Sequence, residues 1–176
     1  QDLQHLKKGT ASAESITMSF WVKSYQTGTY QFNILDLNNT RMISTSVTIN
    51  SSATWEYKTY TFAGDTTGQL SDNNGASLLL EWFLDSGSAH SGGVVPTSWE
   101  AKADADRRLG SIRLGNSTNN YFQLTGVQLE LGSNATPFEH RSYGDELARC
   151  QRYYQIWKDG YLPCNGEGTT ALEFGI

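Results

Sequence analysis

Several segments of the chain alternate apolar with polar side chains, a pattern that gives a β-strand one buried face and one exposed face. In the segment 15–24 the apolar positions are Ile16, Met18, Phe20 and Val22. The segment 29–37 alternates in the same way through Tyr30, Phe32 and Ile34. Each segment is therefore predicted to be a strand that packs one face on a core.

Similar runs predict further strands at 41–50, 55–63, 76–85, 110–114 and 121–131. The turn at 25–28 predicts a hairpin between the first two strands. The run 76–85 is the most continuously apolar, which favours a central strand covered on both faces. Only 18% of the 176 residues are charged and Gly is frequent, which favours strands and turns over helices. The expected fold class is all-β, a sandwich of two sheets.

Composition also excludes several partners. The net charge is −5 and the chain has no basic cluster beyond Arg107 and Arg108, so nucleic acid is not expected. No apolar run reaches the ~20 residues of a membrane span, so no membrane insertion is expected. Cys150 and Cys164 are too few for a disulfide framework and are interpreted as free thiols.

The segment 135–154 combines Glu, His, Arg, Asp and Cys, which suggests an active site at first sight. Ser142 and Asp145 have the spacing of a helix N-cap, and Tyr143, Leu147, Cys150 and Tyr154 follow at helical spacing. Catalysis at 139–141 would require a nucleophile or a metal as partner, and no motif supplies one. The segment is therefore interpreted as a capped helix that links two units, followed by strands at 153–157 and 170–176.

Seven stretches carry a resemblance to a known family. They are Leu6 to Ala13, Ser19 to Ser24, Thr27 to Tyr30, Thr54 to Thr59, Phe62 to Gly68, Gly126 to Gly132, and Ala135 to Tyr154. In these stretches the chain resembles a jelly-roll module of phage tail-fibre and related structural proteins, itself distantly similar to carbohydrate-binding modules. The resemblance implies a β-sandwich at 1–140, a linking helix at 141–155 and the truncated start of a C-terminal β module at 156–176.

The resemblance also implies a function. It indicates a non-enzymatic virion component, part of a tail fibre or similar appendage, that contacts host-surface glycan and other virion proteins. Fibre proteins are usually trimeric, so a homotrimer is expected. An alternative is a purely structural or decoration module whose role is self-association. A glycan-degrading enzyme is a third hypothesis, for which Glu81 and Asp85 offer two carboxylates on one strand face.

Sugar binding by a sandwich requires aromatic rings on a solvated face or loop. Trp21 lies out of phase with Phe20 and Val22, and Tyr57 lies out of phase with the apolar positions of its own strand. Trp99 stands alone in the segment 86–107, which lacks periodicity and has the length of a specificity loop. Trp21, Tyr57 and Trp99 are therefore the predicted carbohydrate-binding residues. Burial in the sandwich or a contact with a neighbouring subunit is the more ordinary role for such rings.

No cofactor or catalytic residue is expected. The turns at 65–68 and 72–75 carry Asp and Asn, whose oxygens could bind a structural calcium ion. They lack the alternating carboxylates of a dedicated calcium loop, so ordinary Asx turns are favoured.

Overall fold

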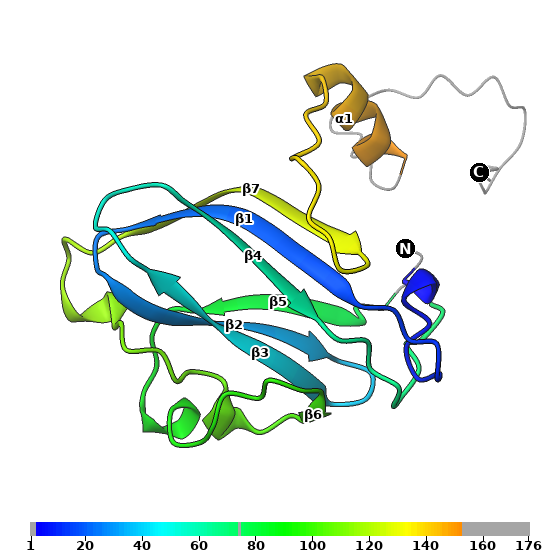
Figure 1. Cartoon of the computed structure of the whole chain (residues 1–176), viewed down its shortest axis with the longest axis horizontal. Coiled ribbons are helices and arrows are strands. Elements are labelled where there is room, and N and C mark those ends of the chain that lie inside the picture. Colours follow the sequence, from blue (N-terminus) through cyan, green and yellow to red (C-terminus); the bar gives the residue numbers. More distant parts are fainter. Residues whose placement is uncertain (1–2, 74, 153–176) are drawn as a thin grey trace, which may run out of the picture. The chain divides into compact units, whose positions relative to one another are not determined.

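A computed structural model of the chain describes residues 3–73 and 75–152. These residues form two antiparallel sheets and one α-helix, so the all-β prediction is confirmed (Figure 1). The chain divides into two compact units, 1–138 and 139–176. Both sheets belong to the first unit, and the helix belongs to the second.

The first sheet has three strands and the second has four. In spatial order, the first contains β4 (Glu56–Phe62), β1 (Ile16–Ser24) and β7 (Phe122–Leu131). The second contains β5 (Leu78–Phe83), β2 (Gly28–Asp36), β3 (Arg41–Ile49) and β6 (Glu100–Ala101). Short 3-10 turns lie at Gln4–Leu6, Ser88–His90, Asp104–Asp106 and Leu114–Asn116.

The core lies between the two sheets, and its members come from both. Phe20 of β1 is fully buried, as is Phe32 of β2, and their ring centroids are 6.3 Å apart. Trp82 of β5 and Phe20 form a T-shaped pair with the centroids 5.5 Å apart. The alternating apolar positions of β1 and β2 therefore face each other across the core, as Figure 1 shows for the two layers.

The predicted hairpin at 25–28 is wrong, because β1 and β2 belong to different sheets. The connection leaves β1 at Ser24, crosses to the second sheet and enters β2 at Gly28. The true hairpin joins β2 to β3, which pair from Gly28 with Ile49 to Asp36 with Arg41. Two strands that bury one face each can either pair or face each other across a core, and alternation alone does not distinguish the two.

Two further strand predictions are corrected. The run 76–85 was expected in mid-sheet, but β5 is an edge strand and Leu79 on its outer side is 42% exposed. The segment 110–114 is not a strand. Instead, Gly110 packs directly on the backbone of Thr29, where a Cβ would lie 2.3 Å from the Thr29 carbonyl oxygen. The Ile112 side chain then enters the core.

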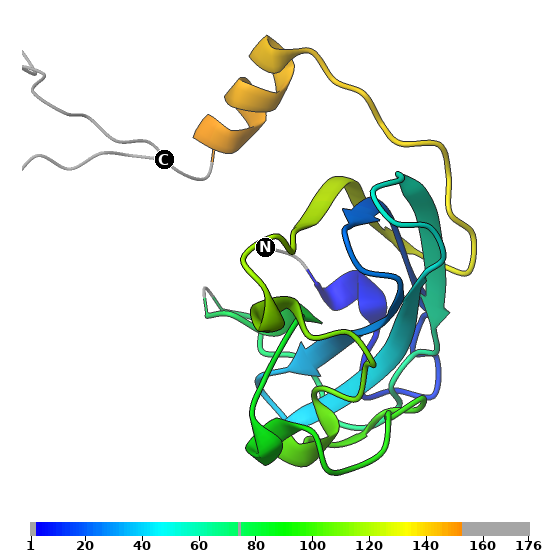
Figure 2. The ribbon, with the colours of Figure 1, turned by 90° about the vertical axis from the view of Figure 1, so that its left-hand side faces the viewer.

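The long segment between β5 and β7 covers the outer face of the second sheet, on the side away from the first sheet in both Figure 1 and Figure 2. Gln31 and Asn33 of β2 point into this cover and are fully buried. Gln31 donates to the Asp106 carbonyl, and Asn33 donates to the Arg107 carbonyl. Within this segment β6 pairs with β3 over two residues, whereas Asp106 and Arg107 bond to side chains of the sheet, so the segment shows no regular alternation.

The helix α1 (Tyr143–Gln151) begins where the sequence predicts. The Ser142 hydroxyl accepts from the Asp145 N–H at 3.2 Å, which confirms the cap. Asp145 and Arg149 form the expected i,i+4 ion pair. The predicted strands at 153–157 and 170–176, and Cys164, lie outside the described residues. No described helix is long and apolar enough to cross a membrane.

Glu56, at the start of β4, anchors the connection from β3. Its carboxylate accepts from the backbone N–H groups of Asn50 and Ser51 and from the Lys58 ammonium. Burial by itself raises the pKa of Glu56, but these hydrogen bonds outweigh it and hold the pKa at about 2, below the ordinary value of 4.5. The stabilisation is therefore present above pH 4.5 and is lost as the pH falls towards 2.

We expect Glu56→Gln to lower the free energy of unfolding at pH 7 by about 1–2 kcal/mol, because a charged acceptor is lost. The difference from the wild type should shrink between about pH 4.5 and pH 2, as the wild-type carboxylate gains its proton. Urea unfolding at pH 7, 4 and 3 measures this. Glu14→Gln, in the exposed pair with Lys7, is the control and should change stability by less than about 1 kcal/mol. A constant difference at all three pH values would contradict the assignment.

Candidate functional site

Two aromatic rings meet on the outer face of the first sheet. Trp21 of β1 and Tyr57 of β4 are direct cross-strand partners, with ring centroids 5.4 Å apart and ring planes inclined by 50°. Trp21 is 43% exposed and Tyr57 is 45% exposed. The outward orientation predicted for both residues is confirmed, because the phases that bury Phe20 and Phe62 turn these two rings away from the core.

A β-bulge in β7 makes room for the Trp21 ring. The ladder between β1 and β7 shifts register between Ser19 and Trp21, and Gly126 of β7 has a φ of +58°. A Cβ at Gly126 would lie 3.3 Å from Trp21 Cδ1 and 3.8 Å from Phe138 Cδ2. Glycine has two roles at this position. It adopts the left-handed conformation without strain, and its lack of a side chain lets the indole lie against the backbone.

Two short polar side chains flank the Trp21–Tyr57 pair within the sheet. Thr59 follows on β4, and Thr125 of β7 is the cross-strand partner of Trp21 on the other side. Trp55, also exposed, lies two residues before Tyr57. We call this end of the outer face, with Trp21, Tyr57, Thr59 and Thr125, the aromatic face. It offers flat apolar ring surface next to hydroxyl groups, a combination suited to a ligand with apolar faces and polar edges.

The structure does not bring Trp99 to the other two predicted residues. The Trp99 indole N–H donates to the Ala63 carbonyl at 2.7 Å, and the ring is partly buried against the core. Ala63 follows the far end of β4, six residues from Tyr57, which is about 20 Å along an extended strand. Trp99 therefore lies near the other end of β4, outside the aromatic face.

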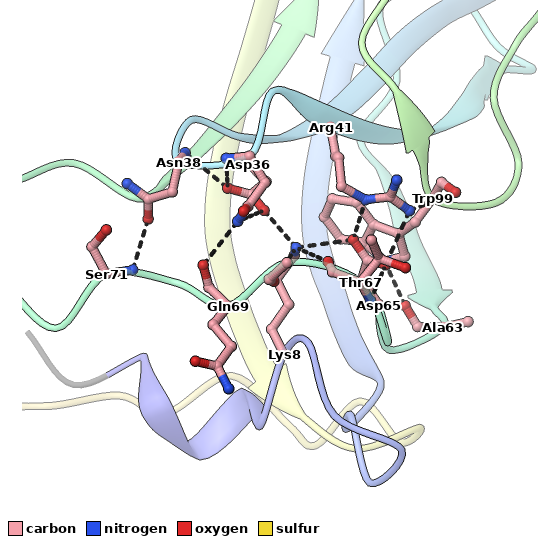
Figure 3. A network of polar contacts seen from close by, with 12 residues as sticks. Lys8, Asp36, Asn38, Arg41, Ala63, Asp65, Thr67, Gln69, Ser71 and Trp99 are labelled. Carbon is pink, nitrogen blue, oxygen red and sulfur yellow. Dashed lines mark hydrogen bonds and ion pairs between the residues drawn. The ribbon is translucent and has the colours of Figure 1, made fainter.

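Trp99 borders a buried ionic cluster that consists of Lys8, Asp36, Arg41 and Asp65 (Figure 3). The Lys8 ammonium lies 2.5 Å from Asp36 Oδ2 and 2.9 Å from Asp65 Oδ2. It also donates to the carbonyl oxygens of Thr67 and Gly68, each at 2.9 Å. Lys8 thus ties the N-terminal segment to the β2–β3 hairpin and to the chain after β4.

The charges of this ionic cluster are balanced. Arg41 donates through Nε and Nη2 to the two oxygens of Asp65. Burial raises the pKa of Asp65, but the bonds from Arg41, Lys8 and the Thr67 N–H outweigh it, so the net shift is downward. The side chains of Lys8 and Asp36 are 4% and 0% exposed, which places the pair in the interior. The four charges of the cluster are paired with one another and Lys8, Asp36 and Asp65 are buried, so the cluster is best explained as a structural element that holds these segments together.

The turn at 65–68, considered above as a calcium loop, uses its oxygens in this cluster. Asp65 Oδ1 accepts from the Thr67 N–H, which is the geometry of an Asx turn, and Oδ2 binds Lys8. In the turn at 72–75, Asn73 accepts from the Gly75 N–H in the same way. Within 3–73 and 75–152, no group of three or more His, Cys, Asp or Glu side chains is placed to hold a metal ion.

The two carboxylates of the enzyme hypothesis are both occupied. Glu81 receives two bonds from the Arg107 guanidinium and one from Asn33. Asp85 accepts from Arg113 and from the backbone N–H of Gly115. Burial raises the pKa of Asp85, but these bonds outweigh it and lower the pKa. Both carboxylates are therefore taken up by an arginine and by amide or backbone donors.

Comparison with known proteins adds no relative, because no protein-family model, curated protein or solved structure matches the chain. The functional conclusion therefore depends on the geometry of the aromatic face.

Proposed function

We propose that this protein is a non-enzymatic carbohydrate-binding module and that the aromatic face is its binding surface. The observation that supports the proposal is the contact between Trp21 and Tyr57, two exposed rings held side by side on a rigid sheet. Exposed apolar surface with a polar rim is a common feature of ligand-binding sites. The bulge at Gly126 provides space for one of them, which supports a functional origin for the pair.

The surroundings of the rings favour a sugar over an apolar peptide. A sugar presents C–H groups on its ring faces and hydroxyl groups at its edges, so it needs flat apolar surface beside hydrogen-bonding groups. Thr59 and Thr125 offer hydroxyl groups, and Gln123 offers an amide at the next outward position of β7. An apolar peptide would leave these groups without partners, at a cost in binding free energy.

The wider setting follows from the resemblance of the sequence motifs. We propose a jelly-roll sandwich in a tail fibre or similar appendage of a phage virion, where the module contacts host-surface glycan. The occupied state of Glu81 and Asp85 supports a role in binding rather than in hydrolysis. A homotrimer remains part of this proposal, and sedimentation of the full chain tests it.

A second candidate function is self-association in a structural or decoration module. Strand β7 is the edge of its sheet, and its apolar residues Leu129 and Leu131 are both exposed. An unpaired edge with exposed leucines can pair with a second copy of the chain. This candidate uses the edge of β7, whereas glycan binding uses the aromatic face, so substitutions separate the two.

A glycan array probed with the full chain tests the proposed function. We expect the wild type to bind a subset of glycans and the double variant Trp21→Ala, Tyr57→Ala to bind none of them. Leu79→Ala is the matched control, because Leu79 has a similar exposure on the other sheet and should leave binding unchanged. An array that stays blank for the wild type while sedimentation shows a stable oligomer would favour self-association instead.

A further inference from the structure

Lys23 differs from the other lysines that the structure describes. Each of the others forms an ion pair with a carboxylate, namely Lys7 with Glu14, Lys8 with Asp36 and Asp65, Lys58 with Glu56, and Lys102 with Asp104. No described carboxylate lies within ion-pair distance of Lys23. Its ammonium lies over the Tyr121 ring, 5.9 Å from the centroid. Lys23 therefore keeps a positive charge that no described side chain neutralises.

Lys23 borders the aromatic face. It follows Trp21 by two residues on β1, so the two side chains point to the same side of the sheet, about 7 Å apart along the strand. Its cross-strand partner is Gln123 of β7, which is neutral. If a sugar ring stacks on Trp21, a charged substituent of that sugar or of its neighbour can therefore reach the Lys23 ammonium.

The outer face of the first sheet has an uneven charge distribution. Its outward positions are Thr17, Ser19, Trp21, Lys23, Tyr57, Thr59, Thr61, Gln123, Thr125, Gln128 and Glu130. The single carboxylate of this set, Glu130, pairs with Thr17 and binds Thr136. It lies six strand positions from Lys23, about 20 Å away. Since the Debye length is about 8 Å in physiological salt, Glu130 does not cancel the field at Lys23.

We infer that the aromatic face is selective for anionic glycans and that the Lys23 ammonium pairs with a sugar carboxylate or sulfate beside the Trp21–Tyr57 pair. This inference rests on the proposed function. The net charge of −5 acts against an anionic polymer at long range, but salt screens distant charges much more than it screens a contact pair. The ion pair formed at contact therefore determines the preference, and the affinity falls as salt is added.

The test uses an array in which each acidic glycan is printed beside a neutral counterpart, carboxyl-reduced for uronates and sialates and desulfated for sulfated chains. The full-length wild type, Lys23→Gln and Lys102→Gln are compared at low and at physiological salt. Lys102 is the matched control, because its charge is already paired with Asp104.

We expect the wild type to bind acidic glycans about five- to tenfold more tightly than their neutral counterparts. Lys23→Gln should remove that preference and most of the salt dependence, while Lys102→Gln changes neither. Hits among neutral glycans only, or an acidic preference that survives Lys23→Gln, would overturn this inference and leave the proposed function intact. Failure of the wild type to bind any glycan would overturn both.

Discussion

Replacement of Lys8 by methionine is expected to lower the free energy of unfolding by about 3–5 kcal/mol. The substitution keeps an unbranched side chain one atom shorter but removes the ammonium, so Asp36 loses its cationic partner in the interior. The carbonyl oxygens of Thr67 and Gly68 lose their donor at the same time. Buried charges and acceptors without partners are among the most destabilising lesions in a folded protein.

Urea or thermal unfolding of the full chain measures this effect, and the adjacent lysine provides the control. Lys7 pairs with Glu14 on the surface, where the two side chains are 54% and 39% exposed. Lys7→Met should therefore cost less than about 1 kcal/mol. The double variant Lys8→Met, Asp36→Asn should recover part of the loss, because the uncompensated charge is gone. Equal effects for Lys7→Met and Lys8→Met would show that the cluster is not a structural tie.

The second large effect is expected on binding. With a glycan identified on the array, Trp21→Ala should weaken affinity about 30-fold or more and Tyr57→Ala about tenfold, the range for aromatic residues at the centre of an interface. The two rings touch, so the double variant should lose less than the product of the single losses. Isothermal titration calorimetry gives the three affinities.

Trp99→Phe is the control for these titrations. It removes the hydrogen bond to Ala63 but leaves the aromatic face intact, so it should lower the melting temperature and leave the affinity within about twofold. Losses of affinity that simply follow losses of stability in all variants would contradict a binding role for Trp21 and Tyr57.

Local pattern was sufficient to predict most of the strands. The period of two at 15–24 identified β1 within one residue and gave the outward side of Trp21. The spacing of Ser142 and Asp145 identified the start of α1. Both features depend only on residues that are close together in the sequence. The position of a strand within a sheet depends instead on pairing between distant segments. For this reason the apolar run at 76–85 predicts a central strand, whereas β5 lies at the edge.

In the candidate site, too, local features are predictable from the sequence and long-range contacts are not. The phase of Trp21 on β1 and of Tyr57 on β4 was visible in the sequence, but their contact depends on the register of two distant strands. The ionic cluster was missed because Lys8, Asp36 and Asp65 come from three separate segments. Trp99 looked available because its loop lacks periodicity, whereas the fold uses its indole N–H to bond Ala63. Long-range pairing determines these roles.

An NMR titration of the tryptophan indole N–H signals tests most directly whether the aromatic face is the binding surface. As a glycan identified on the array is added, the indole signal of Trp21 should shift progressively, and the signal of Trp99 should stay fixed because its N–H is bonded to Ala63. Assignment by single Trp→Phe variants identifies each signal. Shifts at Trp99 with none at Trp21 would place the glycan at the opposite end of the fold and contradict the proposed site.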